Sequence, residues 1–287
     1  MNLAEKICYL CGATKYQYRP GKVRDDKSLK IVECLNCGLV FLSQIELPTD
    51  FYEQSRMHGG EPLPIELWLR ETRKDDERRF RYLNETIINR DILDFGCGNG
   101  GFLKMAQSYA RKVAGIEMEK RLHSYFKTNG LNIFQNIDAL DKSERFDLIT
   151  AFHVIEHLQD PAKTLQKLAE KLSVGGCLIV EVPSSADALL TLYESVPFSE
   201  FTYWSCHLYL FNSSNLELLA KKAELKLDYV SHIQRYPLSN HLYWLSKGKP
   251  GGHQAWSFLD DVNLTSAYEA RLAGLGKTDT LIASFSR

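Results

Sequence analysis

Four cysteines near the N-terminus have the types and spacing of a metal site. "CYLCG" holds Cys8 and Cys11, "CLNCG" holds Cys34 and Cys37, and a glycine follows each second cysteine. Two such tight turns can offer four thiolates to one tetrahedral Zn²⁺, with no position left for a substrate. The alternatives are four unrelated thiols or a redox pair, although redox CxxC pairs normally occur singly at a helix start. We predict a structural zinc ion that stabilises residues 1–45, a fragment too small for its own core.

A glycine-rich turn in "DILDFGCGNGGFL" could hold a second ligand. An apolar strand pattern runs directly into Gly96, Gly98 and Gly100, and Asp94 precedes the turn. Glycines allow a backbone to approach a ligand closely. A dinucleotide pyrophosphate at a helix N-terminus is one such ligand, but its usual glycine spacing differs from the G-C-G-N-G found here.

The elements that must position this turn alternate between strand and helix. Apolar strand patterns and amphipathic helix patterns follow one another from residue 91 onward, which indicates a parallel sheet with helices on both faces. Ligands of such sheets bind at the carboxyl ends of the strands. The predicted strands are 91–96, 112–118, 132–137, 146–154 and 177–183, and the predicted helices are 100–110, 119–130 and 160–172.

Four motifs in this order resemble the class I S-adenosylmethionine-dependent methyltransferases over residues 91–183. The G-x-G-x-G turn after "LD" resembles their first motif, Glu117 ends the second strand, and Asp138 follows the third. "FDLITAFHVIEHLQDP" is similar to their fourth-strand motif. The alternative for this core is an NAD-binding fold, but such folds have no equivalent of this motif. The resemblance implies a Rossmann-like α/β fold with a seven-stranded sheet, six strands parallel and one antiparallel.

The same resemblance implies S-adenosyl-L-methionine as cofactor. Glu117 would accept the ribose hydroxyls, Asp138 would contact the adenine amine, and Asp94 would order the glycine turn near the cofactor's amino group. The cofactor-binding residues expected on this basis are Asp94, Gly96, Cys97, Gly98, Gly100, Phe102, Glu117, Met118, Asp138, Ala139, Phe152 and His153.

Aromatic residues crowd around His207, ahead of a predicted helix capped by Ser213 or Ser214. The chain resembles the sugar C-methyltransferases and their relatives from surface-polysaccharide clusters in three features: the N-terminal zinc knuckle, this core and the "H-L-x-x-F" element. In those enzymes a histidine of this region is the base, and this chain is too short for their further C-terminal domain. His207 is therefore the first candidate for the general base, and His157 and Glu156 follow. The alternative for His207 is a helix cap or an aromatic stack.

Two further strands are predicted, at 227–236 and 278–287, the last of them antiparallel as in the family. The insertion at 237–277 between them is rich in aromatic and cationic residues, which suit an acceptor-binding lid or a homodimer contact. Its "GKPGGH" could bind a phosphate or be only a turn. The candidates for acceptor binding are Tyr203, Arg235, Asn240 and His241.

The chain thus divides into a zinc-knuckle module at 1–45, a helical linker at 46–90 and a methyltransferase domain at 91–287. The linker's Arg and Lys run could be an RNA-binding face, but interleaved Asp and Glu favour a solvated helix. The formal net charge of -1 does not suggest a nucleic-acid partner. Apolar runs fall far short of the roughly 20 residues that a membrane span needs. Seven cysteines without a signal peptide indicate reduced thiols and the cytoplasm.

The sequence therefore predicts methyl transfer to a small-molecule acceptor: a sugar, a nucleotide-sugar or another phosphorylated precursor of a surface glycan. One alternative is an rRNA methyltransferase, since a zinc knuckle on this core also resembles an rRNA guanine methyltransferase group. Against it stand the neutral charge and the absence of an N-P-P-Y motif after the fourth strand. The other alternative is a non-catalytic S-adenosylmethionine-binding protein. Whether oxygen, nitrogen or carbon accepts the methyl group stays open at this stage.

Overall fold

A seven-stranded sheet forms the centre of the protein. The structure, a computed structural model, describes residues 7–44 and 64–287. The strand order is β10-β11-β8-β7-β4-β5-β6, in which β11 is antiparallel to both neighbours and the other six strands share one direction. This confirms the predicted fold. The strands are β4 (Asp91–Phe95), β5 (Lys112–Ile116), β6 (Ile133–Phe134), β7 (Phe146–Phe152), β8 (Leu172–Pro183), β10 (Lys226–Ile233) and β11 (Thr280–Ser286).

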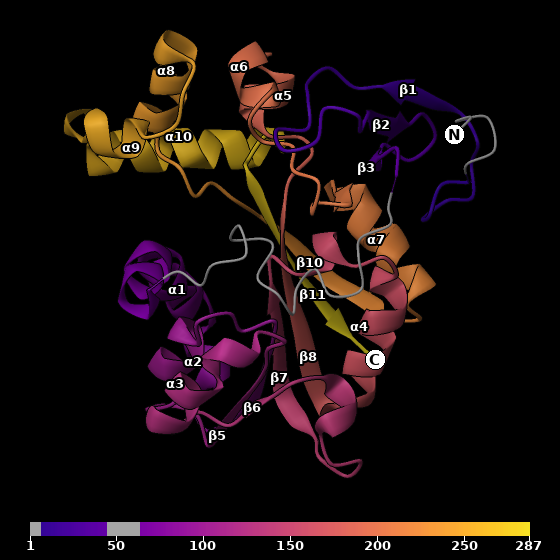
Figure 1. Cartoon of the computed structure of the whole chain (residues 1–287), viewed down its shortest axis with the longest axis vertical. Coiled ribbons are helices and arrows are strands. Elements are labelled where there is room, and N and C mark those ends of the chain that lie inside the picture. Colours follow the sequence, from indigo (N-terminus) through magenta and orange to yellow (C-terminus); the bar gives the residue numbers. More distant parts are fainter. Residues whose placement is uncertain (1–6, 45–63) are drawn as a thin grey trace.

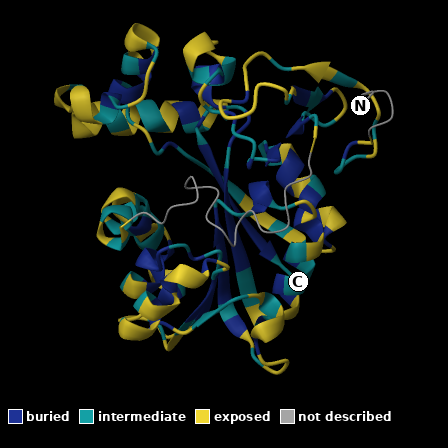
Figure 2. Cartoon of the chain, in the orientation of Figure 1, coloured by how far each residue is buried: buried dark blue, intermediate teal, exposed yellow. Residues whose placement is uncertain are grey.

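Helices cover both faces of this sheet, as the alternating pattern predicted. Figure 1 shows α1 (Ile65–Ile87), α2 (Gly101–Ala106) and α3 (His123–Thr128) on one side, and α4 (Pro161–Glu170) and α7 (Ser213–Lys222) on the other. Successive strand residues point to opposite faces, so Ile92 packs with the α1–α2 core while its neighbour Leu93 packs with the α4–α7 core. The inner strands β4, β7 and β11 are consequently largely apolar and mostly buried (Figure 2), whereas the edge strand β10 is partly exposed.

The start of α7 corrects one prediction. The residue that caps this helix is Asn212, and the prediction of Ser213 or Ser214 is wrong. Asn212 has an extended backbone, and its side chain accepts from the Asn215 N–H at 2.8 Å. The Asn215 side chain accepts from the Asn212 N–H in return, at 3.1 Å. Two asparagines thereby satisfy helix N–H groups reciprocally, which the hydroxyl of a serine one residue later cannot do.

The N-terminal module is joined to the rest of the molecule by a sheet. Its strands β1 (Tyr16–Tyr18), β2 (Ile31–Cys34) and β3 (Val40–Leu42) are antiparallel, and β3 continues the ladder onto β9 (Tyr209–Leu210), two residues before the Asn212 cap. Residues 46–63 of the predicted linker lie outside the described residues, and α1 follows them.

Shorter elements complete the fold. The segment between β10 and β11 folds into α8 (Leu238–Lys247), α9 (Gly252–Ala255), η6 (Ser257–Leu259) and α10 (Val262–Leu275), and in Figure 1 it lies beyond one end of the sheet. Within residues 7–44 and 64–287, none of the helices has the length and apolar character needed to cross a membrane. The remaining elements are η3 (Lys120–Leu122), η4 (Ile137–Ala139), η5 (Ile155–His157), α5 (Ala188–Thr191) and α6 (Val196–Ser199).

A substitution at Gly21 tests the contact between the N-terminal module and residues 199–203. A Cβ at this position would lie 2.5 Å from the Ser199 carbonyl oxygen and 2.7 Å from the Tyr203 ring, and the φ of Gly21 is +126°. We expect Gly21→Ala to lower the unfolding free energy by about 1–3 kcal/mol, and Tm by roughly 2–4 °C per kcal/mol. Thermal unfolding followed by circular dichroism measures this change.

Gly175→Ala is the matched control, because Gly175 has a φ of +75° and no described atom within 4 Å of the added Cβ. It carries the backbone strain without the collision. Equal losses of Tm in the two variants would show that the contact with residues 199–203 contributes nothing.

Candidate active site

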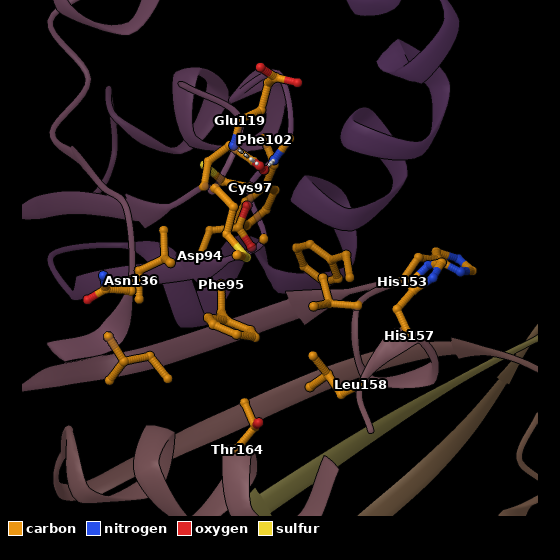
Figure 3. A pocket seen from close by; sticks show the side chains of 18 of the residues that line it. Asp94, Phe95, Cys97, Phe102, Glu119, Asn136, His153, His157, Leu158 and Thr164 are labelled. Carbon is orange, nitrogen blue, oxygen red and sulfur yellow. Dashed lines mark hydrogen bonds between the residues drawn. The ribbon is translucent and has the colours of Figure 1, made fainter. Parts of the chain in front are cut away.

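A cavity of about 770 Å³ opens at the carboxyl ends of β4, β5, β6 and β7. Its walls come from the loops after these strands, from α1 and from the start of α4, and His207 and Arg235 also reach it. Figure 3 shows Asp94, Phe95 and Cys97 near the middle of the cavity, with His153 and His157 toward one end and Asn136 toward the other. This is the place where parallel α/β sheets bind ligands.

Most of the residues expected to bind the cofactor line this cavity. Gly100 and Ala139 do not. The glycines also serve the protein's own packing: at Gly96 the φ is +72°, and a Cβ there would lie 2.4 Å from the Val154 side chain. The lining residues from the prediction are Asp94, Gly96, Cys97, Gly98, Phe102, Glu117, Met118, Asp138, Phe152 and His153.

Glu117 connects the glycine turn to the end of β5. One carboxylate oxygen accepts from the Gly98 N–H at 2.8 Å, and the other accepts from the Glu119 N–H at 2.9 Å. Burial raises the pKa of Glu117, and these backbone N–H groups oppose the rise. The carboxylate has acceptor capacity left for hydroxyl groups of a ligand in the cavity.

The two other predicted cofactor acids differ in exposure. Asp94 is buried beneath the glycine turn, where Thr150 donates to it at 2.7 Å and burial raises its pKa to about 7. The Asp138 side chain is 80% exposed and lies 3.6 Å from the Lys167 ammonium group. Asp94 therefore lies in the interior of the cavity wall, bonded to β7, whereas Asp138 stands at the open rim of the cavity.

Two histidine rings meet at the other end of the cavity. The centroids of His157 and His207 are 4.8 Å apart, with the rings edge to face. The His157 Nδ1 lies 2.8 Å from the Cys206 carbonyl oxygen, so this nitrogen carries the proton. Burial lowers the pKa of His157, and burial followed by the neighbouring His157 lowers the pKa of His207 to about 3. Both imidazoles are neutral near pH 7.

Glu156 lies behind these rings and does not line the cavity. It is fully buried, and the His153 Nδ1 lies 3.1 Å from its Oε1, while the His157 Nε2 lies 3.9 Å away. Burial alone would raise the pKa of Glu156, but the three nearby histidines lower it overall. The group is therefore a carboxylate, whose negative charge favours protonation of the imidazoles beside it.

A network of charges closes the cavity on the α1 side. Glu181 of β8 is fully buried and accepts from Arg78 at 2.9 Å and from Arg79 at 2.7 Å, both on α1. The His153 ring lies between Glu156 and Glu181, at 3.1 Å from each. Burial would lower the pKa of His153, but these two carboxylates raise it. The sequence analysis expected His153 only as a cofactor-binding residue, so its contact with two buried carboxylates was missed.

Arg235 also belongs to this network. Its Nε donates to Asp75 of α1 at 2.9 Å, and its Nη1 lies 3.1 Å from the His153 Nε2. Arg235 lines the cavity, and its role in acceptor binding stays a prediction. Asp75, Asp76 and Arg79 line it as well, although residues 65–87 were predicted to be a linker. In the sequence, Asp and Arg residues three positions apart indicate a charged face on this helix. The sequence does not show that this face pairs with Glu181 and Arg235, because both lie far away along the chain.

Three predicted acceptor-binding residues do not reach the cavity. Tyr203 is buried in the core beneath the module, with Val23 and Ile31. Asn240 and His241 are buried on α8, and the His241 Nδ1 lies 2.7 Å from the Tyr268 hydroxyl. The polar residues of the insertion suggested a binding surface. The sequence did not show that Asn240 and His241 are buried by contacts within the insertion itself.

The four N-terminal cysteines converge as predicted. The Cys8 and Cys37 sulfurs are 3.6 Å apart, as are those of Cys11 and Cys34, and all four lie within 4.8 Å of one another. These separations are too long for disulfide bonds. They approach the edge of about 3.8 Å of a tetrahedron with metal–sulfur bonds of about 2.3 Å. The donor set fits a tetrahedral, thiophilic metal ion.

Comparison with known proteins identifies the family. A family model described as a methyltransferase domain matches residues 68–230, which is more than half of the chain. The chain belongs to this methyltransferase family. A methyltransferase of this type takes its methyl group from S-adenosylmethionine, in agreement with the cofactor that the sequence motifs imply.

Named relatives of this methyltransferase are ubiquinone biosynthesis O-methyltransferases. One from Coxiella burnetii is 31% identical over 110 residues, covering 35% of the chain and 47% of the relative. One from Hydrogenovibrio crunogenus is 25% identical over 178 residues, covering 55% and 73%. The chain thus spans about half the length of the first of these relatives.

A solved S-adenosylmethionine-dependent methyltransferase from Thermotoga maritima, described as a possible histamine N-methyltransferase, has a similar fold. It aligns with a TM-score of 0.51 at 18% identity, over 82% of this chain and 97% of that one. At this identity the likeness concerns the fold alone.

Replacing Glu117 tests the donor end of the cavity. We expect Glu117→Gln to weaken binding of S-adenosylhomocysteine roughly 10- to 100-fold, because the variant loses a charged acceptor for hydroxyl groups. Isothermal titration calorimetry of the purified protein measures the Kd. Glu217→Gln, on the exposed side of α7, is the control and should bind like the wild type. An unchanged Kd for Glu117→Gln would place the ribose elsewhere.

Proposed function

We propose that this methyltransferase transfers a methyl group from S-adenosylmethionine to a hydroxyl group of a small molecule, namely a sugar, a nucleotide-sugar or another phosphorylated precursor of a surface glycan. One observation carries the proposal: a single cavity holds the glycine turn with Glu117 and also His157 with His207. The sequence resemblance to the sugar C-methyltransferases and their relatives supports a sugar-type acceptor. The names of the relatives, which are O-methyltransferases, support oxygen as the acceptor atom.

The donor would lie along the carboxyl ends of β4, β5 and β6. In this arrangement Glu117 accepts the ribose hydroxyls, Asp138 contacts the adenine amine, and Asp94 holds the glycine turn near the amino group. The sulfonium of S-adenosylmethionine supplies the methyl group. The protein then has two remaining tasks, which are to align the acceptor oxygen with that methyl group and to receive the acceptor's proton.

The proton would pass to the histidine pair. When bound, S-adenosylmethionine would supply its methyl group to the acceptor oxygen and would leave as the neutral thioether. The hydroxyl proton moves to an imidazole nitrogen of His207, with His157 as the neighbouring acceptor. Both rings are neutral beforehand, which is the form of imidazole that can accept a proton. The carboxylate of Glu156 favours the imidazolium that forms, because it lowers the electrostatic cost of that charge.

Binding and turnover together test this function. We expect S-adenosylhomocysteine to bind with micromolar affinity in calorimetry and to bind more tightly with a matching member of a nucleotide-sugar panel. Transfer of labelled methyl to that compound should be lost in His207→Ala, while S-adenosylhomocysteine affinity stays within about twofold, since His207 lies away from the donor end. A short RNA hairpin is the competing acceptor. Tightening with RNA alone, or no binding of S-adenosylhomocysteine, would contradict the proposal.

We also propose that the four cysteines hold a structural Zn²⁺. The tetrahedral sulfur arrangement supports this, as does the small size of the module. Metal analysis should find one zinc per chain, and Cys34→Ser should release it and lower Tm. Cys177→Ser is the control, because this cysteine lies outside the cluster. A wild-type protein without metal would refute the proposal. Reduced thiols of this kind fit the cytoplasm, where we place the enzyme.

The segment between β10 and β11 is proposed as an acceptor lid or a homodimer contact. Its large exposed apolar side chains, including Phe258 and Val262, support a role as a contact surface.

A further inference from the structure

A row of stacked side chains leads from the N-terminal module to the cavity. The Arg24 guanidinium lies 4.3 Å from the centre of the Trp204 ring. The Trp204 and His207 ring centroids are 5.8 Å apart, and those of His207 and His157 are 4.8 Å apart. The first member belongs to the module, and the last two line the cavity. The strand pairing and the cysteine cluster account for the attachment of the module, but they do not explain why Arg24 stacks on these rings.

Residues beside Arg24 hold the same loop. Asp25 accepts from the Ser205 N–H at 2.9 Å and from the Ser205 hydroxyl at 2.6 Å, and the Arg24 N–H donates to the Tyr203 carbonyl at 3.0 Å. The His207 N–H donates to the Trp204 carbonyl at 3.0 Å, which closes a turn within the loop. Immediately after His207, the Leu42 N–H of the module donates to the Leu208 carbonyl at 3.2 Å. The module therefore restrains the loop on both sides of His207.

We propose that Arg24 is a positioning residue for His207: by cation–π contact it holds the Trp204 ring against the imidazole and fixes that ring at the acceptor end of the cavity. The inference rests on the proposed function in that His207 meets the acceptor there. Cation–π contacts contribute about 0.5–2 kcal/mol, which is enough to select one arrangement of a loop side chain. Arg24 would thus make the N-terminal module part of the acceptor site without itself touching the acceptor.

The charges around His207 predict the direction in which its pKa should change when Arg24 is removed. Burial is the first cause of its low pKa, and His157, His153 and the positive charge of Arg24 lower it further, while Glu156 opposes them. Loss of Arg24 would free the Trp204 ring, admit water to the imidazole and remove a positive charge. All of these changes raise the pKa of His207. A purely structural role in folding of the module would leave this pKa unchanged.

The experiment compares Arg24→Met with Arg24→Lys by NMR of ¹³C-labelled histidine side chains, using the full chain with its metal and assigning the His207 signal with His207→Gln. In the wild type we expect no titration of His207 between about pH 5 and 8. In Arg24→Met the pKa should rise far enough for His207 to begin titrating within this range. Arg24→Lys retains a cation and should restore much of the wild-type behaviour. Trp204→Leu should raise the pKa of His207 in the same way. If Arg24→Met does not fold, Trp204→Leu takes its place in the experiment.

Lys22→Met is the matched control. Lys22 comes from the same module and pairs with Glu200 of the same segment, but this ion pair is exposed and does not contribute to the row of rings. It should leave His207 unchanged, and all variants should bind S-adenosylhomocysteine within about twofold of the wild type. An unchanged His207 pKa in Arg24→Met, or an equal rise in Lys22→Met, would overturn the proposal.

The titration needs no acceptor, so it separates this inference from the proposed function. If Arg24→Met raises the His207 pKa and His207→Ala still turns over, then His207 is not the base but Arg24 still positions it. If the function holds and an acceptor is known, Arg24→Met should lower kcat/KM for the acceptor at least about 10-fold, with Arg24→Lys partly rescuing it. An acceptor kcat/KM equal to that of the wild type would count against the positioning role.

Discussion

The burial of Glu181 is the constraint on which the cavity depends. A carboxylate cut off from water is tolerated only when it is paired, and removing one partner of such a pair costs about 3–5 kcal/mol. Its partners Arg78 and Arg79 come from α1, and His153 comes from the end of β7. The pairing therefore brings a helix from outside the central sheet across the strand ends. Without it, the cavity would lack one wall.

The same network determines how β7 ends. His153 has a φ of +54°, in the left-handed region that residues other than glycine seldom adopt. Its N–H donates to the Glu181 carbonyl at 2.8 Å, and its ring lies between two buried carboxylates. These contacts offset the strain of the backbone. The chain turns here, and of the residues that follow, His157 lines the cavity while Glu156 lies buried behind it.

A second constraint is the shared sheet of β3 and β9. It places the cysteine cluster against the methyltransferase fold, and Tyr9, between Cys8 and Cys11, bonds to the start of α4. The Tyr9 hydroxyl donates to Asp160 at 2.6 Å and accepts from the Ala162 N–H at 2.9 Å. Asp160 lines the cavity, and so does His207, which β9 follows. The module thus contacts both halves of the site, and a metal ion in its cysteines would stabilise both.

The sequence by itself determined the central sheet and most of the cavity lining around the glycine turn. Glu117 and the glycines of the turn lie beside short motifs at strand ends, and parallel pairing brings strand ends together wherever the strands form. The cysteine cluster was equally visible, because its spacing is local. Only the tertiary structure decided the contacts that hold His153 and His207 in place. Glu181 and Arg78 are 103 positions apart, and Arg24 and Trp204 meet through the β3–β9 pairing. Such contacts depend on which elements pack together, and no local pattern of residue types carries that information.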